Sequence, residues 1–278
     1  MGRMGPEYPA VASLAADSVP ALDAALVDCR ACPRLVAWRE QVAVVKRRSF
    51  ADCDYWARPV PGFGPSTAPL VIVGLAPAAH GGNRTGRAFT GDPSGNVLFA
   101  ALQDLGLATR PESSSRGDGT ELIGVRLTMP VHCAPPDNKP STEERDNCRP
   151  WLARELALMG PPAARVIVAL GGFAWQTLLP VLADAGWRVP RPRPRFGHGA
   201  EVELSDESAG RRTRLIGCFH PSHRNVATRT LTPEMLREVL GRAARLAGLP
   251  EQAGRGGAEV ETVSSPPPDG PMRNGDEA

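Results

Sequence analysis

Four cysteines of this chain are spaced like the ligands of a metal centre. Cys29 and Cys32 form a C-x-x-C pair, and Cys133 and Cys148 follow much later in the segment VHCAPPDNKPSTEERDNC. A short pair combined with a distant pair is a common way of bringing four thiolates to one centre. The second pair sits in a proline-rich loop before a helix start, so a stiff backbone aims its sulfurs. The spacing fits a structural zinc site or an iron–sulfur cluster.

Polar side chains also follow two apolar runs of the sequence. The glycine-rich segment GLAPAAHGGNRTGRAFTGDPSGN (74–96) carries Phe89 and Asp92, and CFHPSHRNVATRTLT (218–232) carries His220. Neither the Walker A pattern nor G-x-G-x-x-G occurs, so a nucleotide-binding loop is not indicated. Taken singly, Phe89 is compatible with core packing and Asp92 with a helix N-cap. A histidine at a strand end that faces a glycine-rich loop favours a functional site.

The elements that would position these residues alternate along the chain. Short runs rich in Val, Ile and Leu predict buried strands, and segments with helical patterns fall between them. Helix starts are marked by Ser141 and Thr142 and by Thr232. The predicted strands are 69–75, 121–128, 164–171 and 213–220, and the predicted helices are 95–107, 141–160, 171–187 and 232–249. This order predicts a three-layer α/β/α fold with a central, mostly parallel, four-stranded sheet, whose ligands bind at the carboxyl ends of the strands.

Composition is that of a globular protein with polar ends. The chain has 278 residues, 42% hydrophobic residues and a net charge of +2. No run approaches the ~20 apolar residues that span a bilayer, and no secretory signal is recognisable. We therefore expect no membrane association and a cytoplasmic location. One domain is predicted over 19–249, with disordered tails over 1–18 and 250–278. Cys53 and Cys218 are expected to be small buried residues.

Arginines gather in three places along the second half of the chain. They lie at 188–195, at 211–214, and at Arg224 and Arg229. Because the net charge is small, the whole molecule does not attract polyanions strongly. Solvated loops and local phosphate contacts are equally compatible with these clusters.

Three of these segments together resemble the uracil-DNA glycosylase superfamily. They are GLAPAAHGGNRTGRAFTGD, CAPPDNKPSTEERDNC and the HPS sequence at 220–222, and the resemblance covers residues 22 to 248. The similarity is to the iron–sulfur-containing type B branch, also called family 5. Family 4 shares the cysteine pattern but usually has Thr-Asn where this chain has Thr128-Met129. The long NRTGRAFTG loop also favours type B.

The resemblance implies a monofunctional glycosylase that hydrolyses the bond between a flipped base and its sugar. It implies a structural [4Fe–4S] cluster bound by Cys29, Cys32, Cys133 and Cys148. This implication decides against zinc. Phe89 would stack on the base, and His220 would contact uracil O2 and stabilise the leaving group. Asp92 would orient the attacking water, and Asn138 would support the water or the sugar.

The resemblance also assigns the pocket wall and the DNA contacts. The turn after the first strand would line the base pocket through Gly74, Ala76, Pro77, Ala78 and His80. The HPS loop would touch DNA through Ser222, His223, Arg224, Asn225 and Arg229. Leu231 is a candidate for the side chain that wedges into the duplex. The implied partner is DNA with deaminated bases, bound by a monomer at the bacterial nucleoid.

Several alternatives remain open at this stage. Met129 offers no amide for reading uracil, so we expect a broad pocket that also accepts bases such as hypoxanthine. A family 4-like enzyme would instead be narrowly specific for uracil. A non-catalytic iron–sulfur DNA-binding sensor is the alternative from another class. Covalent trapping of the abasic product is disfavoured because GGNRTGRAF contains no basic insertion, and a thioredoxin-like enzyme is disfavoured because Cys29 precedes every predicted strand.

Overall fold

The computed structural model describes residues 5, 7–159, 164–207 and 210–250, and its centre is a five-stranded sheet. The strands have the order β2-β1-β3-β5-β4. Neighbouring pairs are parallel except for β4, which runs antiparallel to β5. The strands are β1 (Leu70–Val73), β2 (Val125–Thr128), β3 (Val166–Leu170), β4 (Glu201–Asp206) and β5 (Arg211–Cys218). The predicted α/β class with a mostly parallel sheet is confirmed.

The prediction of four strands was wrong, because it missed the edge strand β4. Its sequence EVELSD alternates charged residues with Val202 and Leu204, and Leu204 is buried against the sheet. Such a period-two pattern is typical of a strand with one buried face. The charged residues and the arginine-rich surroundings hid this pattern, because an exposed edge strand lacks the continuous apolar run of a central strand.

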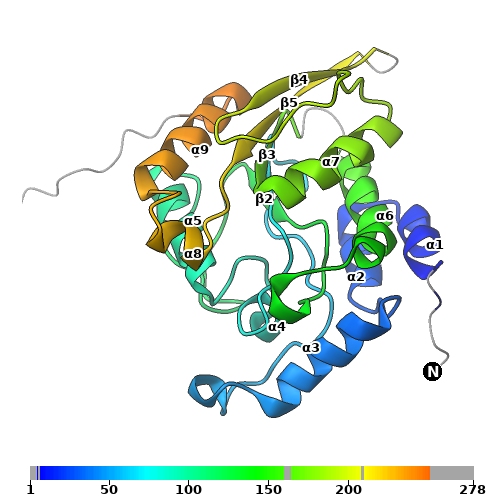
Figure 1. The fold of residues 1–278 in the computed structure, drawn as a ribbon, viewed down its shortest axis with the longest axis vertical. Helices are drawn as coiled ribbons and strands as arrows, with labels where there is room; N and C mark the ends of the chain where they lie inside the picture. The colour runs from blue at the N-terminus through cyan, green and yellow to red at the C-terminus, as the bar shows by residue number, and fades with distance from the viewer. Residues whose placement is uncertain (1–4, 6, 160–163, 208–209, 251–278) are drawn as a thin grey trace, which may run out of the picture.

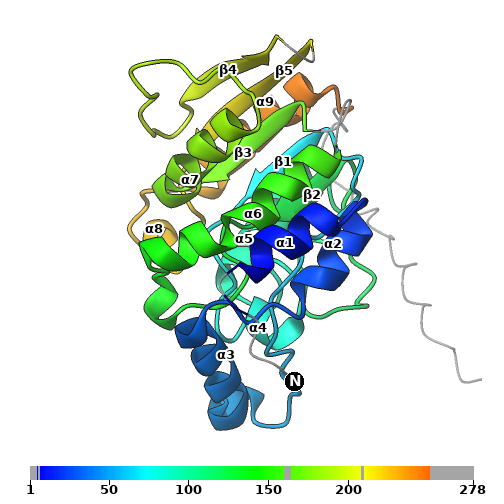
Figure 2. The same cartoon turned by 90° about the vertical axis from the view of Figure 1, so that its right-hand side faces the viewer.

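Two layers of helices cover the sheet, as Figures 1 and 2 show. Along β1, Leu70 and Ile72 face the layer with α5 and α9, whereas Val71 and Val73 face the layer with α6 and α7. This alternation follows from the pleat of a strand. The four helices are α5 (Pro93–Asp104), α6 (Thr142–Met159), α7 (Gly172–Asp184) and α9 (Pro233–Ala247). All four were predicted from the sequence, with ends shifted by a few residues.

Three further helices precede the sheet: α1 (Tyr8–Ala15), α2 (Val19–Leu26) and α3 (Pro33–Val45). Helices α1 and α2 pack on the outer side of α6. The Tyr8 ring lies 6.1 Å from that of Trp151, and its hydroxyl donates to the Ala25 carbonyl at 3.1 Å. Residues 7–18 therefore differ from the disordered tail expected over 1–18. The tail expected over 250–278 lies outside the described residues beyond Pro250.

A buried ionic network ties β2 to two of these helices. The Arg126 guanidinium donates to Glu155 of α6 at 2.5 Å and to Asp23 of α2 at 3.1 Å. Thr128 donates to the other oxygen of Glu155 at 2.5 Å. Buried charges are tolerated when each has partners of this kind. The network fixes the helices that carry part of the cysteine set.

Four short elements complete the carboxyl edge of the sheet and its surroundings. They are η1 (Arg48–Phe50), α4 (Gly82–Thr85), η2 (Pro136–Asn138) and α8 (His223–Ala227). Within the described ranges, no helix is both long enough and apolar enough to cross a membrane. The loops after β1, β2 and β5 meet at one edge, and this edge holds the site.

Candidate active site and candidate metal centre

A cavity of about 260 Å³ opens at the carboxyl ends of β1, β2 and β5. Its walls come from the loop after β1, the start of α5, the loop after β2 and the HPS turn. The lining residues are Leu75, Ala76, Pro77, Ala78, Phe89, Asp92, Ser94, Met129, Asn138, His220 and Ser222. The sequence singled out most of these residues, but Leu75 and Ser94 were missed.

Asp92 stands at the junction of the cavity and α5. Its Oδ1 accepts hydrogen bonds from the backbone N–H groups of Ser94 and Gly95, at 3.0 and 3.1 Å. Its Oδ2 approaches Gly81 so closely that a Cβ atom there would lie 2.3 Å away. Burial raises the pKa of Asp92, although the two backbone donors and Arg84 act in the opposite direction. Asp92 is therefore both a helix N-cap and a carboxylate of the cavity wall.

His220 follows the end of β5 and faces the same cavity. Its backbone carbonyl accepts a hydrogen bond from the Asn225 side chain at 2.8 Å, which holds the HPS turn closed. Ser222 caps the short helix α8 by accepting from the Asn225 N–H. Burial lowers the pKa of His220 to about 4. The imidazole is consequently neutral at physiological pH and presents an N–H donor rather than a cation.

Phe89 lies beside His220, with ring centroids 6.3 Å apart and planes inclined by 29°. Its φ of 52° is unusual for a bulky residue and marks local backbone strain. Gly74 leaves the space that the ring fills, because a Cβ there would lie 2.4 Å from the Phe89 Cζ atom. Phe89 thus forms an aromatic wall of the cavity, and its ring occupies the space left free by Gly74.

A buried network that sequence reasoning missed holds the turn of Phe89. The Arg87 guanidinium donates to Asp118 and Ser113 at 2.6 Å each, and to Thr90 at 3.1 Å. The pKa of Asp118 is held well below its ordinary value, since hydrogen bonds from Arg87 and from backbone N–H groups outweigh burial. Arg87 belongs to the NRTGR segment, but no sequence signal paired it with Asp118.

Some predicted site residues lie beside the cavity and not in its lining. Gly74 lies behind the Phe89 ring. His80 turns away, and its Nδ1 hydrogen-bonds the Tyr55 hydroxyl at 2.9 Å. His223, Arg224 and Arg229 are exposed on α8 and the turn after it. Leu231, the wedge candidate, is buried in the main core, so it does not reach a bound duplex.

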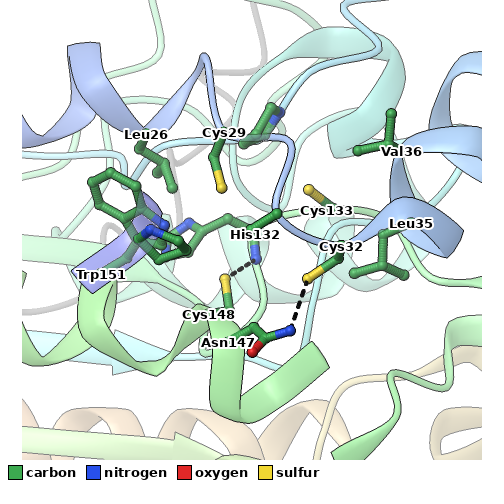
Figure 3. A pocket seen from close by; sticks show the side chains of 13 residues that line it. Leu26, Cys29, Cys32, Leu35, Val36, His132, Cys133, Asn147, Cys148 and Trp151 are labelled. Carbon is green, nitrogen blue, oxygen red and sulfur yellow. Dashed lines mark hydrogen bonds between the residues drawn. The ribbon is translucent and has the colours of Figure 1, made fainter. Parts of the chain in front are cut away.

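The four cysteines with the spacing of metal ligands all line a second hollow, shown in Figure 3. Cys29 follows α2, Cys32 precedes α3, Cys133 lies in the loop after β2, and Cys148 lies in α6. Their sulfurs point toward one another around the hollow. Burial raises the pKa of Cys32 to about 12, and the nearby Cys133 and Cys29 act in the same direction. The distant pairs of the sequence are therefore neighbours in space.

Hydrogen-bond donors surround these sulfurs. Arg39 donates to the Cys133 sulfur at 2.9 Å, and the His132 backbone N–H donates to the Cys148 sulfur at 3.4 Å. The Asn147 amide lies 4.0 Å from the Cys32 sulfur. Arg39 is almost fully buried, and its Nε is without a partner among the described residues.

Across the described ranges, no three histidine, cysteine or carboxylate side chains are grouped so that they could hold one metal ion. Cys218 is buried, as expected, but Cys53 is only partly buried in the segment after η1.

Comparison with known proteins agrees with the fold. The model of the uracil DNA glycosylase superfamily matches residues 61–244. The chain therefore belongs to the uracil DNA glycosylase superfamily. It is 53% identical over 234 residues to the type-5 uracil-DNA glycosylase of Mycobacterium tuberculosis (strain CDC 1551 / Oshkosh), covering 84% of each chain.

Two further relatives distinguish the branches of the superfamily, since the type-5 relative is the more similar of the two. The type-5 uracil-DNA glycosylase of Thermus thermophilus is 49% identical over 224 residues, which are 81% of this chain and 96% of that one. A type-4 enzyme of Pyrobaculum aerophilum is 34% identical over 178 residues, 62% of this chain and 78% of that one. Within the superfamily the chain belongs to the type-5 branch, as the sequence motifs indicated.

Proposed function

We propose that the protein removes uracil from DNA by hydrolysing the bond between the base and the deoxyribose. The observation that carries this proposal is the arrangement of Asp92, Phe89 and His220 around one cavity at the carboxyl edge of the sheet. The names of the type-5 relatives support the substrate. A base must leave the duplex stack to reach such a cavity, at a cost of a few kcal/mol.

The flipped base would lie against Phe89 with its O2 near His220. As the glycosidic bond breaks, its electron pair leaves with the base, and negative charge grows on the base oxygens. A neutral imidazole N–H stabilises that charge by a hydrogen bond. The low pKa of His220 keeps the imidazole neutral while no substrate is bound. The empty site therefore holds no histidine cation that would attract an anion in place of the substrate.

Asp92 would act on the sugar side of the breaking bond. Its ionised carboxylate offsets the positive charge that develops on the sugar and orients the water that attacks C1′. The water oxygen forms the new bond to C1′, and its proton is released toward the carboxylate. Asn138, which is exposed and also lines the cavity, supports the water or the sugar in this proposal.

The cysteine site is proposed to hold a [4Fe–4S] cluster. Four thiols around one buried hollow are the donor set that such a cluster requires. A single Zn²⁺ needs four sulfurs at ~2.3 Å from one point. Across the described ranges no three histidine, cysteine or carboxylate side chains are grouped to hold one metal ion, which favours a cluster, in which iron and sulfide atoms separate the thiolates.

The surroundings of Arg39 support an anionic group in this hollow. In the part of the chain that the structure describes, no carboxylate forms an ion pair with Arg39, although its side chain is almost fully buried. A buried cation is costly unless anions accompany it. Thiolates of a bound cluster would supply them, and the group would contribute cross-linking of the fold rather than chemistry on the base.

The remaining parts of the proposal concern DNA and place of action. Ser222 and Asn225 would hold the HPS turn against the DNA backbone, while His223, Arg224 and Arg229 would contact phosphates. The protein is proposed to act as a monomer. Its proposed place of action is the bacterial nucleoid, in the cytoplasm, because its DNA substrate lies there.

Base release and DNA binding separate this function from a non-catalytic sensor. Purified protein is incubated with a duplex that carries one uracil, and the product is cleaved with alkali. We expect a break at the uracil, reduced about 10²–10⁴-fold in Asp92→Asn. Asparagine is as good an N-cap as aspartate, so α5 keeps its cap and DNA affinity stays near that of the wild type. No break despite normal DNA binding would favour the sensor.

The breadth of the pocket is tested with a second base. Met129 is buried in the wall and offers no hydrogen-bonding group to a base edge. Sharp rejection of analogues depends on such groups. We expect release of both uracil and hypoxanthine opposite the same base, measured as single-turnover rates. Release of uracil alone would identify a narrow, type-4-like specificity.

A further inference from the structure

We propose that the segment RPRPRF (191–196) is a phosphate-binding flank of the active site, which contacts the DNA backbone beyond the flipped nucleotide. The inference rests on the proposed function. It concerns Arg191, Arg193 and Arg195, which are exposed and lie between α7 and β4. We call these three residues the arginine flank.

The arginine flank is fixed to the domain at its C-terminal end. The Trp175 indole N–H of α7 donates to the Pro194 carbonyl at 2.9 Å. The Phe196 ring lies 6.1 Å from the ring of Trp175 and 6.1 Å from that of Phe219. An anchored backbone loses less entropy when its side chains bind a ligand.

These anchors place the flank beside the active site. The Phe219 backbone N–H donates to Nδ1 of His198 at 3.2 Å, and the next residue along the chain is His220. In Figure 2 the segment between α7 and β4 and the helix α8 both lie on the left-hand side of the molecule. A duplex with one nucleotide in the cavity would extend along this side.

Charge pairing distinguishes the flank from the other arginines nearby. On the β4–β5 hairpin and next to it, each arginine has an acidic partner: Arg188 with Glu207, Arg211 with Asp206, Arg212 with Glu203, and Arg214 with Glu201 and Glu203. Among the described residues, none of the three flank arginines forms an ion pair or a side-chain hydrogen bond. The hairpin is internally neutralised, and the flank is not.

Duplex phosphates are the partner that fits these groups. Unpaired guanidinium groups bind phosphate oxygens in a bidentate manner. The prolines between them lack backbone N–H donors, so the guanidinium groups supply most of the hydrogen-bond donors of this segment. Arg224 and Arg229, also exposed and without acidic partners in the described ranges, would extend the same basic side across the HPS turn.

The test compares two triple variants that lose the same charge. One is Arg191→Gln, Arg193→Gln and Arg195→Gln. The control is Arg188→Gln, Arg212→Gln and Arg237→Gln, whose arginines are all paired with acids. Affinity is measured over a KCl series for a long duplex with 2′-fluoro-2′-deoxyuridine, from which uracil is not released.

We expect the plot of log affinity against log salt to become shallower by about 0.9 for each phosphate that the flank variant no longer binds. The control is expected to keep the wild-type slope. Equal slopes in the two variants would overturn the inference. Should the flank variant unfold, the single variants Arg191→Gln, Arg193→Gln and Arg195→Gln are measured one at a time; a shallower slope in at least one supports phosphate binding, and wild-type slopes in all three refute it.

A second substrate separates this inference from the proposed function. On a duplex that ends close to the uracil on the side of the flank, the flank variant should release uracil at the wild-type rate. Absence of release by the wild type from any duplex would contradict the proposed function, while the salt slopes would still report phosphate binding. Normal release by the wild type with an unchanged slope in the flank variant would contradict only the flank.

Discussion

The two oxygens of Asp92 have different surroundings. Oδ1 accepts two backbone hydrogen bonds at the start of α5, whereas Oδ2 accepts neither of them and lies against Gly81. The sequence offered an N-cap and a catalytic acid as alternatives, and the geometry accommodates both. Capping fixes the carboxylate, and a fixed carboxylate is what a short-lived positive charge on a sugar requires.

The neutral state of His220 has a measurable consequence. Because its pKa is about 4, the folded protein binds fewer protons there than the unfolded chain between pH 4 and the ordinary histidine value of about 6.5. The contribution of neutral His220 to the free energy of unfolding is therefore fully present above pH 6.5, the ordinary histidine value, and is lost as the pH falls toward 4. The ring signals of His220 in an NMR titration should stay those of a neutral imidazole at pH 5.5.

Assignment of the His220 signal comes from its disappearance in His220→Gln. The same variant should show a weaker fall of unfolding free energy between pH 6.5 and 4 than the wild type. A midpoint near 6.5 for the His220 signal would contradict the neutral donor and favour a protonated imidazole as the group that stabilises the leaving base.

Among the elements, α4 is linked directly to the cysteine site. Asn83, which is buried in α4, donates to the backbone carbonyl of Arg39 at 3.2 Å, and Arg39 donates to the Cys133 sulfur. Arg84, also in α4, holds the carbonyls of His80 and Gly91. These contacts connect the loop that carries Phe89 and Asp92 to helix α3, which lies beside the four cysteines.

Asn83→Ala should therefore disturb the active-site loop while leaving the cysteines intact. Loss of a buried hydrogen bond costs about 1–3 kcal/mol of stability. A catalytic group displaced by about 1 Å loses on the order of 10² in rate. We expect slower uracil release with unchanged iron content per chain. Asn96→Ala, an exposed change on α5, is the matched control and should behave like the wild type.

The outcome for Asn83→Ala is judged by two measurements together. Iron and visible absorbance report the proposed cluster, and single-turnover rates report the loop. Equal rates in Asn83→Ala and Asn96→Ala would show that the hydrogen bond to Arg39 does not position the active-site loop.

Sequence patterns predicted the central elements well and the outer ones poorly. The strands β1 and β3 were recognisable because their residues are apolar on both faces, and β2 and β5 because a short apolar run lies in or beside each of them. The strand β4 and the helix α1 lie at the periphery, where one face is exposed and charged or alanine-rich residues weaken the pattern. The position of His80 was not predictable either, since it depends on Tyr55, a partner in a different loop.

At the scale of the whole molecule, the cysteine site joins segments that the sheet does not hold. Cys29 and Cys32 flank the turn between α2 and α3, whereas Cys133 and Cys148 belong to the loop after β2 and to α6. Helix α3 projects from the sheet layers in Figure 1. Helix α3 contacts the rest of the chain through the ion pair of Arg34 with Glu144 and through Arg39, and the proposed cluster would add bonds from the four sulfurs.

Removal of one sulfur should therefore loosen one end of the molecule and spare the other. In Cys148→Ser we expect loss of iron, a lower Tm, and faster protease cleavage between α2 and η1 than within the sheet. Ligand-dependent folding of this kind follows because a bound group stabilises only the folded state. Cys53→Ser, which lies outside the hollow, should keep the iron content, Tm and cleavage pattern of the wild type.

The same experiment decides between two roles of the cysteine site. If uracil release falls together with protease resistance, the site supports the active-site loop mechanically, through Arg39 and Asn83. If Cys148→Ser loses its iron but keeps its Tm, its cleavage pattern and its rate, the four cysteines do not hold the fold together. Their convergence would then have to be explained by electron transfer or by sensing, and the search for a redox response would begin at the hydrogen bond between Arg39 and the Cys133 sulfur.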